Sequence, residues 1–295
     1  MIRRVATTCL VAAATLVVCA CGGGDGSAAP APVPTADRFD ARRAFADLTM
    51  QVRLGPRPAG SAASRTLGAR LRARLPNGRF EKVPGGLRNV VGHLPGRGKA
   101  ILLAAHYDTK DLPGFVGAND GAGGVAVVLE VARALARDRR ACQRELRLAF
   151  FDGEESPRGS NDFAADGLRG SRAYVAAHPR GLRAMVLADF VADRDLRIPR
   201  EPTSNPGLWK KLRAAAARVG VGRVFPATTG PAILDDHTPF LERGVPAIDL
   251  IDFDYPPFHT AADDLGAVSA RSLDATGETL VVLLRRLRAE TCRSR

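Results

Sequence analysis

The sequence predicts an α/β protein, a three-layer α/β/α sandwich whose central sheet is mixed and mostly parallel. Short apolar runs alternate along the chain with longer segments in which apolar residues recur at helical spacing. The short runs are apolar on both faces, which is typical of strands that helices cover on each side. The chain has 295 residues, 45% hydrophobic and 25% charged, and is long enough for such a domain.

Each expected element follows from a local pattern. Helices are predicted where apolar residues recur every three or four positions, as at Leu67 and Leu71 or at Val125 and Val128. Strands are predicted where short apolar, partly β-branched runs end at glycine or proline. In chain order these patterns predict helices at 40–53 and 61–74, strands at 89–94 and 100–105, a helix at 121–137, a strand at 146–151, a helix near 171–177, a strand at 184–188, a helix at 207–219, a strand at 247–251 and a closing helix at 269–290.

The first residues predict export from the cytoplasm. Arg3 and Arg4 precede an apolar run, residues 5–18, that is too short to span a bilayer. The sequence VCAC, which ends at Cys21, resembles a bacterial lipobox, and the small Ala20 suits cleavage before an acylated Cys21. An ordinary secretory signal without lipid is the alternative. We therefore expect a lipoprotein signal peptide at 1–20, a flexible Gly/Pro/Ala-rich tether at 21–36 and one folded domain at 37–295, held outside the cytoplasm at a bacterial cell membrane.

Cysteine content fits an oxidising compartment. Besides Cys21, the chain after the predicted cleavage point contains only Cys142 and Cys292. Because thiols outside the cytoplasm usually oxidise, we expect a Cys142–Cys292 disulfide that fastens the closing helix to the region before the strand at 146–151. Two separate buried thiols are the alternative.

The formal charge of +12 raises the question of a nucleic-acid partner. The arginines are scattered, however, without interleaved aromatic residues or a known binding motif, so no nucleic-acid partner is expected. A solvated, arginine-rich surface is the favoured interpretation, and attraction to an anionic membrane surface is the alternative.

Side chains suited to metal binding occur in five segments that follow or end apolar strands. Proteins with such sheets bind their ligands in the loops that follow the carboxyl ends of the strands, so these side chains are expected to meet there. Each one alone has a structural alternative, such as helix capping for an aspartate or an internal hydrogen bond for a histidine. The segments contain His106 with Asp108, Asp120, Glu154 with Glu155, Asp189, and His259.

Imidazole nitrogens and carboxylate oxygens are zinc ligands, and Asp108 follows His106 closely enough to orient its ring. The other three histidines, His93, His178 and His237, are interpreted as structural, and His178–Pro179 is expected to end a helix.

In the order HYD, GAND, GEE, a later Asp, and HT followed by acidic residues, these motifs resemble those of the zinc aminopeptidase and glutaminyl cyclase superfamily. The resemblance extends from about residue 53 to about residue 273. It implies a catalytic domain at 37–295 with a central mixed sheet of about six to eight strands between helices.

The resemblance also implies roles for single residues. Asp120, Glu155 and His259 would bind the first zinc ion, and Glu154 would be the general acid/base. It further implies a cis peptide bond between Asp120 and Gly121. In two-zinc aminopeptidases, Asp120 would bridge to a second ion held by His106 and Asp189.

Two reactions remain open within this superfamily. The segment LDDHTPFLERGVP resembles the cyclase version, because Asp235 stands where aminopeptidases commonly have serine, and it implies an acidic network of Glu154, Asp189 and Asp235. Helix capping is the alternative for Asp235 and Asp236. Two departures from cyclases are Phe258, where tryptophan usually precedes the last zinc histidine, and the lack of tryptophan in the loop after Glu155.

The favoured function is a glutaminyl-peptide cyclotransferase, which converts N-terminal glutamine to pyroglutamate with release of ammonia and uses one zinc ion. A two-zinc aminopeptidase is the main alternative, and a non-catalytic peptide-binding lipoprotein is a remote one. The expected substrates are amino termini of peptides or proteins, with Phe258 as an apolar wall of the pocket, and the expected oligomeric state is a monomer.

Overall fold

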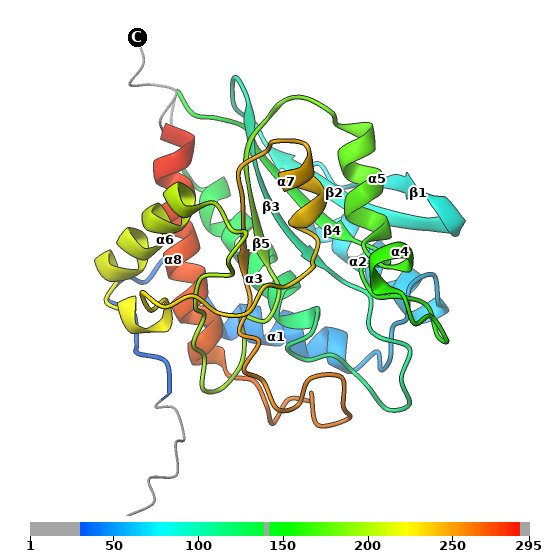
Figure 1. The fold of residues 1–295 in the computed structure, drawn as a ribbon. Coiled ribbons are helices and arrows are strands. Elements are labelled where there is room, and N and C mark those ends of the chain that lie inside the picture. Colours follow the sequence, from blue (N-terminus) through cyan, green and yellow to red (C-terminus); the bar gives the residue numbers. More distant parts are fainter. Residues whose placement is uncertain (1–29, 139–141, 290–295) are drawn as a thin grey trace, which may run out of the picture.

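Six strands form one sheet in the order β1-β2-β4-β3-β5-β6. The structure, a computed structural model, describes residues 30–138 and 142–289 (Figure 1). The strands are β1 (Arg79–Val83), β2 (Leu87–Leu94), β3 (Ala100–His106), β4 (Leu146–Phe151), β5 (Leu182–Ala188) and β6 (Ala247–Leu250). The helices are α1 (Ala41–Val52), α2 (Ala62–Arg74), α3 (Ala122–Ala136), α4 (Phe163–Asp166), α5 (Arg169–Ala177), α6 (Pro206–Arg218), α7 (Thr238–Glu242) and α8 (Ala270–Ala289), with short 3₁₀ turns η1 (Pro84–Gly86) and η2 (Gly222–Val224).

Strand directions confirm the predicted mixed, mostly parallel sheet. Strands β4, β3, β5 and β6 are parallel to one another, whereas β2 is antiparallel to both β1 and β4. The carboxyl ends of the four parallel strands therefore meet at one edge of the sheet, where the loops that follow them converge.

Helices cover both faces of the sheet, which confirms the three-layer arrangement. Alternate side chains of β3 point to opposite faces, because successive residues of a strand do so. Ile101 and Leu103 pack in a core with α1, α2, α3, α6 and α8. Leu102 and Ala104 belong to a smaller core with α5 and α7 on the other face.

Each helix and strand predicted from the sequence is present, with ends that agree within a few residues. Strand β1 is the main omission. Its sequence, RFEKV, has little apolar alternation because β1 is the edge strand, pairs only with β2 and buries only Val83. The short helices α4 and α7 are too brief to show a helical period. Helix α5 ends just before His178, as expected.

The connection into α3 differs from the expectation. All peptide bonds between described residues are trans, so the predicted cis bond between Asp120 and Gly121 is wrong. Gly121 turns the chain through a positive φ of 93°, which glycine adopts without the steric cost that a side chain would bring.

The two ends of the chain lie partly outside the described residues. The predicted signal peptide, Cys21 and most of the predicted tether fall there. Residues 30–36, expected to be the end of that tether, instead lie against the domain, where Ala31 is buried and the Thr35 amide donates to the Val219 carbonyl at 2.9 Å. Cys142 is disulfide-bonded, but its predicted partner Cys292 lies outside the described residues, so their pairing stays a prediction.

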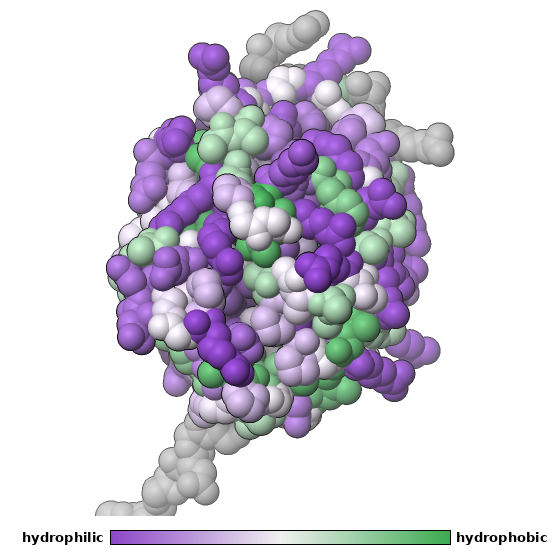
Figure 2. All heavy atoms as spheres, turned by 90° about the vertical axis from the view of Figure 1, so that its right-hand side faces the viewer, coloured by the Kyte–Doolittle hydropathy of each residue, from purple (hydrophilic) through white to green (hydrophobic). Residues whose placement is uncertain are grey.

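The face that carries β1 and α5 exposes both polar and apolar side chains. Figure 2 shows mostly hydrophilic side chains there, with apolar ones scattered in small patches. Within the described residues, no helix combines the length and the hydropathy that crossing a bilayer requires.

Close packing between α3 and β5 gives a first prediction. A Cβ atom on Gly124 would lie 2.0 Å from the Ala188 carbonyl oxygen, which belongs to the backbone and cannot move alone. Gly124→Ala should therefore lower the free energy of unfolding by about 1–3 kcal/mol, although alanine favours helices. Urea unfolding measures it. Gly222→Ala, whose Cβ would meet nothing closer than 3.6 Å, is the matched control, and equal stability of both variants would contradict the packing argument.

Candidate active site

Asp120 lies at the centre of the site, in the loop that leads into α3. Its Oδ1 is 3.2 Å from Nε2 of His106, the last residue of β3. Its Oδ2 is 3.4 Å from Nε2 of His259, which comes from the loop between β6 and α8. The two oxygens of one carboxylate thus face two histidines from distant parts of the chain.

Each histidine has a second carboxylate neighbour. Nε2 of His106 is 3.0 Å from Oδ1 of Asp189, the residue after β5, and Nε2 of His259 is 3.0 Å from Oε1 of Glu155, after β4. Two groups of three donors result, and in each group one donor atom from every residue lies within 4.8 Å of the other two. The groups are His106, Asp120 and Asp189, and Asp120, Glu155 and His259.

His259 has an unusual backbone conformation, with a φ of 52°. Non-glycine residues rarely adopt such values, and those that do are concentrated at functional sites. The ring of Phe258 stacks on the His259 imidazole, with centroids 3.8 Å apart, and Phe115 contacts it edge-on at 5.7 Å. The neighbouring rings hold the imidazole between them.

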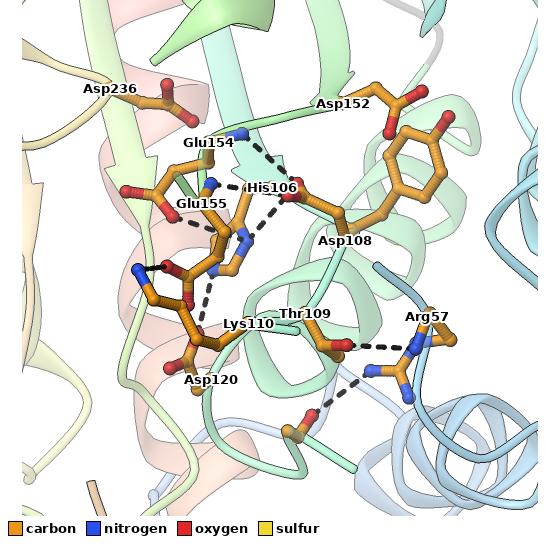
Figure 3. Close-up of polar contacts among 12 residues, drawn as sticks. Arg57, His106, Asp108, Thr109, Lys110, Asp120, Asp152, Glu154, Glu155 and Asp236 are labelled. Atoms are coloured by element: carbon orange, nitrogen blue, oxygen red, sulfur yellow. Dashed lines mark hydrogen bonds and ion pairs between the residues drawn. The ribbon is translucent and has the colours of Figure 1, made fainter. Parts of the chain in front are cut away.

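Asp108 positions the loop that carries both glutamates (Figure 3). Its two carboxylate oxygens accept hydrogen bonds from the backbone amides of Glu154 and Glu155, each at 3.2 Å. Its distance to Nδ1 of His106 is 3.8 Å, too long for the orienting hydrogen bond expected from the sequence. Asp108 therefore acts on the glutamate loop more directly than on the histidine.

Asp263 and Arg57 hold the loop that carries Asp120. The Asp263 carboxylate accepts the backbone amides of Asn119 and Asp120, at 2.8 and 3.1 Å. The fully buried Arg57 guanidinium donates to the carbonyls of Val116 and Gly117, and burial lowers its pKa to about 10. Both ends of the Asp120 loop are thus fixed by buried charged groups.

Lys110 supplies a cation at the edge of the site. Its Nζ lies 3.1 Å from Oε2 of Glu155 and donates to Ser156 Oγ at 2.7 Å. The two oxygens of Glu155 consequently face different partners: Oε1 faces His259, and Oε2 faces Lys110 (Figure 3).

A pocket of about 450 Å³ opens above these side chains. Its floor is acidic and its walls are apolar. Phe253 and Phe258, each 37% exposed, and Leu234, 40% exposed, lie at its mouth, and Phe190 contacts both phenylalanines. The carboxylates in its lining are those of Asp120, Glu154, Glu155, Asp189 and Asp235.

Crowding of carboxylates shifts their pKa values apart. Burial raises the pKa of Glu154 well above its usual value, and the neighbouring Glu155 carboxylate raises it further. Burial and the Asp235 carboxylate raise the pKa of Asp189 in the same way. For Asp120, the neighbouring imidazoles of His106 and His259 outweigh burial and hold the pKa at about 2.

The donors fit a divalent metal ion. Imidazole and carboxylate are common zinc ligands, and three protein ligands are usual for a catalytic zinc. Oδ2 of Asp120 is buried and has no hydrogen-bond partner among the described residues, so it is available as a ligand. The donor group around His106 also combines one imidazole with two carboxylates, and its three members are all buried.

A further buried group of possible metal ligands includes Asp235 itself. Asp235, His237 and Asp249 place donor atoms within 4.8 Å of one another. His237 Nε2 lies 2.9 Å from Thr203 Oγ1 and 3.3 Å from Glu201 Oε2. His237, interpreted as structural from the sequence, thus connects the Asp235 loop with the chain after β5.

The residues predicted to bind metal, to act in catalysis or to form the pocket meet at one edge of the sheet. Most of them line the pocket. His106 and Asp108 lie beside it, in contact with Asp120 and with the glutamate loop. Lys110, Glu201 and Asp249 are not marked by the sequence patterns described above. Lys110 stands two positions after the HYD motif, and this closeness is the only signal in the sequence that points to it. Glu201 and Asp249 stand alone among unrelated residues, so no spacing pattern marks them.

The fold and the paired donor groups define an α/β protein of the zinc exopeptidase type. The sequence profile of peptidase family M28 matches residues 89–284, and the chain belongs to that family.

Proteins similar in sequence to this chain include glutaminyl-peptide cyclotransferases. The chain is 29% identical to a glutaminyl-peptide cyclotransferase of Bos taurus over 66% of its own length and 65% of the relative's. It is 33% identical to a glutaminyl-peptide cyclotransferase-like protein of the same species, over 60% and 54% of the two lengths. The chain therefore spans less than two thirds of the length of these relatives.

Solved structures of similar proteins are matched almost completely. A glutaminyl cyclase from an Acidobacteriales bacterium aligns with a TM-score of 0.74 and 31% identity, over 88% of this chain and 99% of the other. A leucine aminopeptidase precursor from Bacteroides thetaiotaomicron aligns with a TM-score of 0.75 and 26% identity, over 85% and 99%.

The Glu201 carboxylate gives a prediction about acid stability. Hydrogen bonds from His237 and Thr203 outweigh burial and lower its pKa from 4.5 to about 2. A lowered pKa in the folded state stabilises the protein above pH 4.5, and this contribution is lost as the pH falls towards 2. Glu201→Gln should therefore cost about 3 kcal/mol at neutral pH and progressively less below pH 4.5. Urea unfolding at several pH values tests this. The exposed Glu242→Gln is the control, and a pH-independent loss for Glu201→Gln would contradict the assignment.

Proposed function

We propose that this protein is a glutaminyl-peptide cyclotransferase, which converts the N-terminal glutamine of a peptide to pyroglutamate and releases ammonia. The observation that carries the proposal is the Asp235 carboxylate, which lines the same pocket as Glu154 and Asp189. The cyclases among the relatives and solved structures support it.

One zinc ion, held by Asp120, Glu155 and His259, would polarise the side-chain amide carbonyl of the substrate glutamine. The protein's own contribution is to fix these three side chains. Asp108 holds the backbone at Glu155, and Asp263 holds the backbone at Asp120.

Glu154 is the proton carrier in this proposal. The substrate's α-amine forms a bond to its side-chain carbonyl carbon, and the bond from that carbon to the amide nitrogen breaks. Glu154 accepts the proton that the amine loses and delivers it to the departing nitrogen, which leaves as ammonia, so the carboxylate ends as it began. The raised pKa of Glu154 suits this exchange, because efficient proton carriers have a pKa near the working pH.

Asp189 and Asp235 complete the acidic network. Carboxyl groups this close cannot all ionise at low cost, and the Asp235 charge is a cause of the raised pKa of both Glu154 and Asp189. A proton shared within this network would remain available to Glu154 throughout the reaction.

Apolar walls favour ring closure. Phe258, Phe190 and Ile233 line the pocket beside the carboxylates, and they would contact the methylene groups of the glutamine side chain and exclude water. Holding the amine against the amide carbonyl supplies much of the rate, because the reaction is intramolecular.

A zinc aminopeptidase is the second candidate, and one specific observation favours it. His106, Asp120 and Asp189 form a complete second donor group that could hold a further ion. Glu154 would then take a proton from the water that attacks the first peptide bond. The similar leucine aminopeptidase precursor supports this alternative.

For the location, we propose that the protein is exported and acylated at Cys21. The acyl group would hold the domain on the outer side of a bacterial cell membrane. We propose a monomer as the oligomeric state. The support is the amino-terminal sequence, with its basic start, apolar run and VCAC motif.

Two substitutions separate catalysis from metal binding. Glu154→Gln should lower turnover by about 10²–10⁴-fold and leave the zinc content unchanged, because the side chain moves protons and binds no ion. His259→Ala should lose both zinc and activity. Metal analysis and steady-state kinetics measure these effects. Normal turnover by Glu154→Gln, or unchanged zinc in His259→Ala, would refute the respective role.

The choice between the reactions rests on a paired assay. With Gln-peptides and Leu-arylamides offered side by side, we expect ammonia release, no leucine release and one zinc per chain. Asp235→Asn should lower cyclisation by about 10²-fold, at the lower end of general acid–base effects. Asp254→Asn is the control, because Asp254 is exposed and does not line the pocket. Two zinc ions per chain with leucine release would establish the aminopeptidase instead.

A further inference from the structure

A basic groove of about 690 Å³ lies between the amino-terminal segment and helices α6 and α8. Its lining includes no acidic residue among those described and five basic ones, Arg38, Lys211, Arg218, Arg285 and Arg286. The carboxylate-rich pocket of the candidate active site shares no lining residue with it.

Three of these cations are available to a ligand. Arg285 forms an ion pair with Asp138, at 2.5 Å, and Lys211 is also engaged in an interaction. Arg38, Arg218 and Arg286 are exposed, and their side chains form no ion pair or hydrogen bond with any residue that the structure describes. They come from three different elements, the amino-terminal segment, the end of α6 and the last turns of α8.

The groove lies where the chain enters the domain. Thr35, which lines the groove, donates its amide to the Val219 carbonyl at the end of α6, and the Arg223 guanidinium donates to the Pro30 carbonyl. Pro30 comes nine residues after Cys21. Nine residues span at most about 30 Å, so an anchor at Cys21 would hold the groove close to the membrane surface.

The same orientation leaves the active site open. Helix α8 begins shortly after the His259 loop and runs for 20 residues. At about 1.5 Å per residue, Arg286 lies roughly 24 Å along the helix from its start. A membrane that contacts Arg286 would therefore lie well away from the start of α8 and from the His259 loop that precedes it.

From this charge and placement, we infer that the groove binds the anionic headgroups of membrane phospholipids. Three guanidinium groups spread over an open groove match the phosphates of several neighbouring headgroups, because guanidinium pairs well with phosphate oxygens. The inference goes beyond the proposed reaction and does not depend on it.

Vesicle binding tests the inference. All helices and strands that the structure describes begin after residue 30, so a chain that starts at Gly22 keeps the groove. This chain lacks Cys21 and therefore cannot be acylated there. We expect it to co-sediment with phosphatidylcholine vesicles that contain phosphatidylglycerol and not with phosphatidylcholine alone. The double variant Arg218→Gln/Arg286→Gln should bind about 30-fold more weakly, since each basic residue at an anionic surface contributes about 1 kcal/mol and about 1.4 kcal/mol is tenfold.

The control variant loses the same charge elsewhere. Arg70→Gln/Arg180→Gln removes two exposed arginines, one on α2 beside β2 and one before β5. It should bind almost as well as the unaltered chain, and circular dichroism and peptide turnover should be unchanged in both variants.

Three outcomes would overturn the inference. Equal losses in the two double variants would mean attraction by net charge alone. Undiminished binding by Arg218→Gln/Arg286→Gln would remove the groove from the interaction. Displacement from the vesicles by inorganic phosphate at constant ionic strength, with phosphate binding in solution, would identify a site for free phosphate.

Discussion

Compensation of buried negative charge is the constraint on which the rest of this structure depends. Five carboxylates line one pocket, and each must find a proton, an imidazole or a metal ion, because an isolated buried charge is prohibitively costly. Asp120 and Glu155 are compensated by His106, His259 and Lys110. Glu154 and Asp189 are less well compensated, and their raised pKa values express this.

Backbone amides and one buried arginine extend the same principle outward. Asp108 and Asp263 accept main-chain N–H groups from the loops that present Glu155 and Asp120. Arg57 saturates carbonyl groups of the Asp120 loop from the other side. The loops that carry Glu155 and Asp120 are therefore held through their backbone amides, and these contacts use none of the carboxylate oxygens of the two side chains. Such indirect support is expected where geometry must be kept within fractions of an ångström.

The architecture and most of the site can be predicted from the sequence, because both depend on local patterns. Buried strands such as β3 and β4 appear as apolar runs, and the reactive residues follow them at the edge where parallel strands end. Strand β1 escapes prediction because an exposed edge needs no apolar alternation. Glu201 and Asp249 escape it because their contacts with His237 depend on the tertiary fold. The exact partner of Asp108 also depends on tertiary distances that spacing does not encode.

Sequence separation within the site has a consequence for how the protein matures. Glu155 and His259 are 104 positions apart, and His106 and Asp189 are 83 apart, so no short fragment contains a complete donor set. Closing such long loops is entropically costly and comes late when a chain collapses. A nascent or truncated polypeptide therefore has no means of capturing the ion tightly. Loading with a metal ion would therefore belong to the finished fold, because the donor set is complete only when every loop has reached its place.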